Sequence, residues 1–192
     1  MSNYEQERKE LNFATLVKQE FLFLHDFGFI EIESLPTIVR YKNNEVEVHI
    51  YHGRQSYEIG LEFIYKDTSY PLSEFIRVVA PELAQQYRNP SATEQQSVSR
   101  MLSKIAELTK KYCLLGLEGN AEFFAILERN RSLWREEYAF QTKAYQLRAK
   151  ANEAFHNKNY SKAFELFKEI KSCLNPSELK KMEMSWRKIK SE

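Results

Sequence analysis

The chain has 192 residues, 43% of them hydrophobic, and its 28 Lys and Arg nearly balance 27 Asp and Glu, which gives a net charge of +1. This length allows one ordinary domain or two small ones, and the presence of only five Gly and five Pro excludes a disordered or loop-rich chain. No apolar run approaches the ~20 residues that span a bilayer, and the N-terminus is charged without an apolar signal core, so we expect a cytoplasmic protein.

The N-terminal segment predicts one helix followed by a strand. Apolar side chains recur near a 3.6-residue period over residues 4–27, and Gly28 is a natural residue to end a helix. Alternation over residues 29–33 indicates a first strand, after which Ser34-Leu35-Pro36 turns the chain. We expect this helix to cover the sheet that follows.

Residues 37–65 predict three antiparallel strands joined by two tight turns. Asn43-Asn44 favours a type I′ turn and Gly53-Arg54 a type II′ turn. These turns set the register, with Arg40 opposite Glu47 and His49 opposite Glu58. One face of the sheet is then apolar and the other polar, because side chains alternate along a strand.

The rest of the chain predicts helices. We expect short helices over 72–79 and 82–87, a helix over 91–116 with a capping box from Ser91 to Glu94, and later helices over 161–174 and 177–190. Residues 121–157 form either one long helix or two with a joint near Asn130-Arg131-Ser132.

The elements together predict an α+β protein. An N-terminal helix lies on a three- to four-stranded antiparallel meander, and a bundle of four to five helices follows. Arg88-Asn89-Pro90 is the best boundary, which gives one part over 1–88 and a second over 89–192, and the two parts either have separate cores or share one. Residues 1–70 hold 7 Lys and Arg against 12 Asp and Glu, whereas residues 71–192 hold 21 against 15, so the sheet end is acidic and the helical end basic.

Two segments resemble known families. Ala154, Tyr160, Ala163 and Phe167, with Asn175-Pro176, occupy positions typical of one tetratricopeptide-type hairpin over 147–176, although Lys158 stands where that repeat prefers Gly. No second copy follows at the 34-residue period, and such arrays need about three copies. The segment VHIYHGRQSYEIGLEF, residues 48–63, resembles small bacterial proteins, some of which occur near toxin systems. This resemblance implies an immunity-type role and no catalytic motif.

The polar sheet face contains the candidate site. Its expected binding residues are Glu45, Glu47, His49, Tyr51, Glu58 and Glu62. A His49 and Glu58 pair across two strands is a candidate for general acid–base catalysis, or else one rung of a salt-bridge ladder. His49 and His52 point to opposite faces of their strand, which excludes a shared metal ion, and Cys113 and Cys173 have no metal-ligand spacing. We expect neither a metal nor a cofactor.

These observations favour a non-enzymatic module that binds another protein. In its most concrete form it is an immunity-type inhibitor whose acidic face covers a basic toxin site. One alternative is a small enzyme built on His49 and Glu58. Another is nucleic-acid binding through the basic C-terminal helices, with Lys180, Lys181 and Lys188 as contacts, which the near-neutral pI disfavours. An exposed sheet edge also offers pairing with a second copy.

Overall fold

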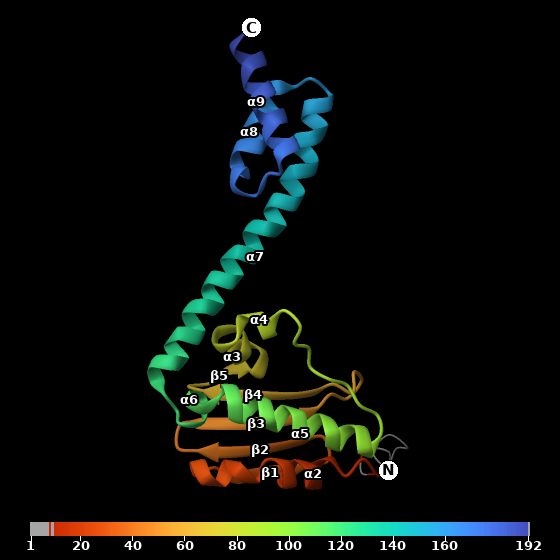
Figure 1. The fold of residues 1–192 in the computed structure, drawn as a ribbon, viewed down its shortest axis with the longest axis vertical. Coiled ribbons are helices and arrows are strands. Elements are labelled where there is room, and N and C mark those ends of the chain that lie inside the picture. Colours follow the sequence, from red (N-terminus) through yellow and green to blue (C-terminus); the bar gives the residue numbers. More distant parts are fainter. Residues whose placement is uncertain (1–7, 9, 192) are drawn as a thin grey trace. The chain divides into compact units, whose positions relative to one another are not determined.

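The computed structural model describes residues 8 and 10–191 and confirms the α+β class (Figure 1). The chain divides into two compact units, one ending at Asn130 and the other beginning at Arg131. The sequence boundary at 88 and 89 lies inside the first unit. Within the described residues, no helix is both long enough and apolar enough to cross a membrane.

The predicted N-terminal helix is interrupted rather than continuous. Residues 4–7 and 9 lie outside the described residues, Arg8 and Glu10 are helical, and the chain after Asn12 forms α2 (Phe13–Glu20) and the 3-10 helix η1 (Leu22–Phe27). Asn12 has a φ of 52°, which is incompatible with a continuous helix through that position. The predicted end is confirmed, because Gly28 closes η1 in the left-handed conformation with a φ of 75°.

One antiparallel sheet organises the first unit, with its strands in chain order. The strands are β1 (Ile30–Leu35), β2 (Ile38–Asn43), β3 (Val46–His52), β4 (Ile59–Tyr65) and β5 (Thr68–Pro71). The sequence prediction missed β5. Lys66 and Asp67, with φ values of 48° and 61°, form the tight turn before it; Asp tolerates positive φ, but Lys at the first turn position is not a residue that signals such a turn.

The predicted register of both hairpins is wrong, although the predicted faces are right. Asn43 pairs with Val46, so Arg40 lies opposite His49 instead of Glu47. His52 pairs with Ile59, so His49 lies opposite Glu62 instead of Glu58. The partners move by two and by four positions, and an even shift leaves every side chain on its expected face.

The apolar face of the sheet is covered by helices and forms the core. Figure 1 shows α2 and α5 (Gln95–Tyr112) packed on this face, and the short helices α3 (Leu72–Val79), α4 (Pro81–Ala84) and α6 (Leu114–Leu117) complete the unit. Val98, Leu102 and Ile105 of α5 are buried in the same cluster as the strands. The sheet and α5 therefore share one core.

The predicted capping box before α5 is wrong. The helix begins at Gln95 after Glu94, whose side chain makes no capping hydrogen bond. Ser91 instead pairs with Glu58 in an antiparallel bridge. The Ile59 N–H donates to the Pro90 carbonyl over 2.7 Å, and the Ala92 N–H donates to the Tyr57 carbonyl over 3.0 Å. Strand-like pairing therefore uses the residues that the sequence assigned to the helix start.

The second unit is helical. The single long helix α7 (Ala121–His156) confirms the one-helix alternative and passes through the division between the units. It is followed by α8 (Tyr160–Glu169), the 3-10 helix η2 (Lys171–Cys173) and α9 (Pro176–Lys190). A small core holds the unit together, and its buried members are Ala151, Ala154, Ala163, Phe167 and Met182. Asn175 and Glu178 form a reciprocal capping box at the start of α9.

Candidate functional site

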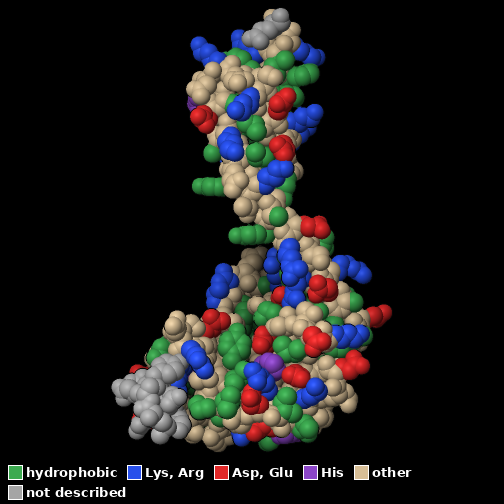
Figure 2. Space-filling model, turned by 180° about the vertical axis from the view of Figure 1, so that it is seen from behind, with side chains coloured by type: hydrophobic (Ala, Val, Ile, Leu, Met, Phe, Trp, Pro, Cys, Tyr) green, Lys and Arg blue, Asp and Glu red, His purple; other side chains and the backbone are tan. Residues whose placement is uncertain are grey.

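No helix formed by the described residues covers the second face of the sheet, and we call it the open face. Seen from behind, it bears Lys, Arg, Asp, Glu and His side chains interspersed with hydrophobic ones (Figure 2). Strand pairing arranges these side chains in cross-strand rows. The charged row contains Glu33, Arg40, His49 and Glu62, and the apolar row contains Leu35, Ile38 and Tyr51, with Gly60 at its end.

His49 lies at the centre of the charged row between two carboxylates. Its Nε2 is 3.0 Å from Glu47 Oε2 and its Nδ1 is 3.4 Å from Glu62 Oε1, while 13% of the side chain is exposed. Burial alone lowers the pKa of His49, but the hydrogen bonds of Glu62 and Glu47 together raise it above its ordinary value. The bond to His49 in turn lowers the pKa of both carboxyl groups. The arrangement stabilises an imidazolium ion.

This geometry gives His49 a structural role rather than that of a general base. Both ring nitrogens already have carboxylate partners, Glu47 and Glu62, so neither is free to accept a proton from a substrate in this arrangement. Glu58, its predicted partner, instead accepts a hydrogen bond of 2.6 Å from Asn89 Nδ2. The predicted cross-strand pair of His49 and Glu58 is therefore wrong, because the loop before β4 is longer than a two-residue turn.

The open face is balanced in charge rather than acidic throughout. Lys42 Nζ lies 3.0 Å from Glu47 Oε1, and Arg40 forms an ion pair with Glu33. Ser69 Oγ donates to Glu62 Oε2 over 2.6 Å. Glu45 lies exposed in the turn between β2 and β3. Of the predicted binding residues, Glu47, His49 and Glu62 thus form one connected network, whereas Glu45 and Glu58 lie outside it.

Tyr51 is the aromatic residue of this face. Its ring lies over Gly60 on the neighbouring strand, where a Cβ atom would overlap the ring. Burial, with smaller effects of Glu58 and Glu62, raises the pKa of the Tyr51 hydroxyl. Glycine at position 60 therefore lets the tyrosine lie flat against the sheet. Tyr51 was predicted from the sequence, whereas Leu35 and Ile38 were not, because their neighbours on this face follow only from the register of β1, β2 and β3.

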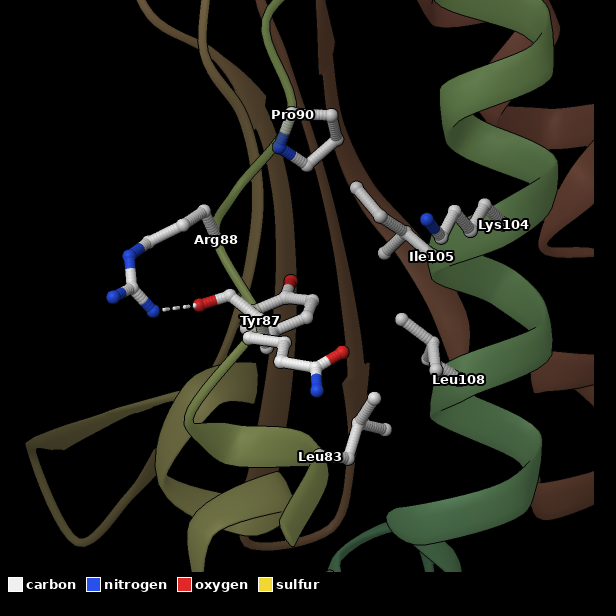
Figure 3. Close-up of a pocket in the computed structure, with 8 residues that line it drawn as sticks. Leu83, Tyr87, Arg88, Pro90, Lys104, Ile105 and Leu108 are labelled. Carbon is white, nitrogen blue, oxygen red and sulfur yellow. Dashed lines mark hydrogen bonds between the residues drawn. The ribbon is translucent and has the colours of Figure 1, made fainter. Parts of the chain in front are cut away.

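A groove in the first unit is a second candidate site (Figure 3). It lies between α5 and the segment that runs from α4 to Pro90, and its volume is about 280 Å³. Its lining is mainly apolar, and three residues add polar or cationic groups. The lining residues are Leu83, Tyr87, Pro90, Ile105 and Leu108, with Gln86, Arg88 and Lys104.

Metal ligation and thiol chemistry have no support in the described part of the chain. No group of three or more His, Cys, Asp or Glu side chains there is arranged to hold a metal ion. Cys113 is fully buried, and its burial raises the pKa of the thiol well above its ordinary value. A thiol in this state is a poor nucleophile, because the thiolate is the reactive form.

Comparison of the chain with protein-family models, with curated proteins and with solved structures finds no match. The resemblances of residues 48–63 and 147–176 therefore stay predictions.

Proposed function

We propose that this protein is a non-enzymatic module that binds another protein on its open face. The observation that supports this proposal is the apolar row beside the charged row. Leu35 is 47% exposed, and Ile38 and Tyr51 are half-buried on the same face. Interfaces combine an apolar and aromatic centre with polar surroundings, and aromatic residues contribute most of the binding energy at such centres.

The side chains of this face are held in place before any partner binds. Tyr51 lies against Gly60, and His49 lies between Glu47 and Glu62. Binding therefore immobilises few new rotamers, which lowers the entropic cost of association. In this proposal Tyr51 is the anchor, and the charged row sets specificity and orientation.

The partner that suits this surface best is a basic protein. The unit that ends at Asn130 holds 14 Lys and Arg against 19 Asp and Glu, a net charge of −5. An acidic unit accelerates encounter with a basic partner at low ionic strength. The concrete form of the proposal is an inhibitor whose open face covers the basic site of a toxin, as the sequence resemblance implies.

Two other functions remain as alternatives. The second unit holds 14 Lys and Arg against 8 Asp and Glu, which favours an anionic partner such as nucleic acid. Lys181 is a poor contact for it, because its Nζ donates to Asn152 Oδ1 over 2.6 Å. Exposed Lys180, Arg187 and Lys188 are better candidates. β1 and β5 each pair with one strand, and these edges offer pairing with a second copy.

The first test compares partner capture by the wild type and by Tyr51→Ala from an extract of the native cells. We expect the wild type to retain one stoichiometric protein and Tyr51→Ala to bind that protein roughly 30-fold more weakly. Tyr138→Ala is the matched control, because Tyr138 is 76% exposed on α7, far along the chain from the sheet. The affinity of each variant for the purified partner is measured by titration calorimetry.

Equal affinity of the wild type and Tyr51→Ala for the retained protein would refute docking on the open face. Retention that disappears after nuclease treatment, and in a variant with Lys180, Arg187 and Lys188 changed to Ala, would replace the proposal with nucleic-acid binding. Circular dichroism of each variant establishes that the fold is intact.

A further inference from the structure

We propose that the groove between α5 and the segment 85–90 binds a small carboxylic acid with an apolar tail, such as a medium-chain alkyl carboxylate. This site is separate from the open face and does not depend on the function proposed for that face. The groove has fixed walls, an apolar lining, cationic groups and a volume that suits a small ligand.

The segment 85–90 forms the wall of the groove opposite α5, and hydrogen bonds fix this segment to its neighbours. Tyr87 Oη donates to Asn89 Oδ1 over 2.9 Å, and Asn89 Nδ2 donates to Glu58 at the start of β4. Pro90 is fixed by its main-chain bond to Ile59. Burial raises the pKa of the Tyr87 hydroxyl well above its ordinary value, so this group stays a neutral donor. The cavity is therefore preformed, as small-molecule sites usually are.

The lining of the groove separates apolar from cationic groups. Leu83 and Leu108 are half-buried, so an alkyl chain against them replaces water on apolar surface, and the buried Ile105 lies between them and Pro90 in the lining (Figure 3). Figure 3 shows the Lys104 side chain extending from α5 beside Ile105 toward the segment that holds Pro90. An alkyl chain against the leucines thus leaves its head group within reach of an amine.

The charge of the groove selects an anion. Lys104 and Arg88 are both lining residues, and no Asp or Glu is among them. Arg88 Nη1 donates to the carbonyls of Tyr87 over 2.6 Å and Gln85 over 3.3 Å, which directs its guanidinium along its own segment (Figure 3). Lys104 makes no ion pair with any other described residue. Its ammonium is the group that we assign to the ligand carboxylate, with the Gln86 amide as an additional donor.

The size of the groove selects a small ligand. A volume of about 280 Å³ lies just below the roughly 300–1,000 Å³ of typical ligand-binding cavities. A single medium-length alkyl chain fits this space better than a folded peptide or a nucleotide. Octanoate is therefore the probe, with octanol as the same chain without charge and acetate as the same charge without the chain.

The experiment is a calorimetric titration of the full-length protein with each probe. We expect octanoate to bind more tightly than octanol, and acetate not to bind measurably. Lys104→Met keeps the apolar stem and removes the charge, so octanoate affinity falls roughly tenfold while octanol affinity is unchanged. Lys110→Met is the matched control, because Lys110 lies on the same helix with its ammonium 4.6 Å from the centre of the Phe23 ring. Its octanoate affinity stays at the wild-type value.

NMR of the side-chain methyl groups shows where octanoate binds. We expect the signals of Leu83, Ile105 and Leu108 to shift on addition of octanoate, while those of residues 131–192 do not. Absence of octanoate binding, an equal affinity in Lys104→Met, or shifts confined to the second unit would each overturn the proposal.

Discussion

Replacing Phe124 with alanine lowers the free energy of unfolding of the first unit by about 3–5 kcal/mol. Phe124 lies in the first turns of α7 and is 2% exposed. Its ring stacks on Tyr65 at 4.2 Å between centroids and lies 5.3 Å from Tyr70 and 6.2 Å from Phe75. The alanine variant leaves a cavity among rings from β4, β5 and α3, which cannot close without moving the strands.

The measurement is amide hydrogen exchange at Val48 and Phe63, which pair across β3 and β4 at the centre of the sheet. Ile126→Ala is the control on the same helix, because Ile126 is 41% exposed and its loss is expected to cost less than about 0.5 kcal/mol. Comparable losses of protection in the two variants would show that the aromatic cluster does not determine the stability of this unit.

The sequence was sufficient to predict which side chains lie on each face of the sheet. Side chains alternate along a strand, so the face of a residue depends only on whether its position is odd or even. Val39, Val48 and Ile50 are buried as the alternation predicts, whatever the length of the turns. Register depends on the exact turn, and the second turn contains a residue that sequence rules do not favour there. Tyr57 adopts a φ of 53° and accepts a cation–π contact from Arg8, whose guanidinium carbon lies 4.1 Å from the ring centre. A distant side chain thus stabilises a loop longer than the local sequence indicates.

The open face could be predicted in part from the sequence, whereas the groove could not. Glu47, His49, Tyr51 and Glu62 were predicted to share a face, and they do, but the neighbours of His49 follow from the register and were assigned wrongly. The groove had no sequence signal beyond the break at Arg88-Asn89-Pro90. It exists because Pro90 and Ala92 pair with residues 57–59 at the start of β4 while α5 packs on the apolar face of the sheet, and this is a tertiary relation between separate segments.

Replacing His52 with alanine is expected to lower the free energy of unfolding by about 3–5 kcal/mol at pH 8. The ring is 2% exposed and stacks on Phe13 at 5.5 Å between centroids. Arg8 Nη1 donates to His52 Nδ1 over 2.6 Å, which makes Nε2 the protonated nitrogen and the donor to the Ala92 carbonyl at 2.8 Å. Truncation therefore removes a buried ring and also the hydrogen bonds that join three separate segments.

Urea unfolding followed by circular dichroism measures this loss. His25→Ala is the control, because His25 is an exposed histidine at the end of η1. If both histidine variants unfold at the same urea concentration, the buried position of His52 contributes nothing particular to stability.

His52 also makes stability depend on pH, with a sign opposite to that of His49. Burial lowers the pKa of His52 and the nearby Arg8 lowers it further, against a raising effect of the Ala92 carbonyl. Below the unfolded value of about 6.5, the unfolded chain therefore binds a proton that the folded chain excludes, and stability falls as the pH decreases toward the folded pKa. His49 has a raised pKa, so its contribution is present below about 6.5 and is lost as the pH rises through the folded value.

The difference between the wild type and His52→Gln isolates the first effect, because His49 is the same in both proteins. Glutamine keeps an amide donor for the Ala92 carbonyl but does not titrate. As the pH falls from 7 toward 5, we expect the wild type to lose stability relative to His52→Gln, with a slope below the limit of about 1.4 kcal/mol per pH unit that one fully excluded proton would give. Urea midpoints at half-unit steps of pH measure this difference. Parallel curves for the two proteins would mean that the buried His52 takes up a proton in the folded state as readily as in the unfolded chain, which the donation from Arg8 to Nδ1 opposes.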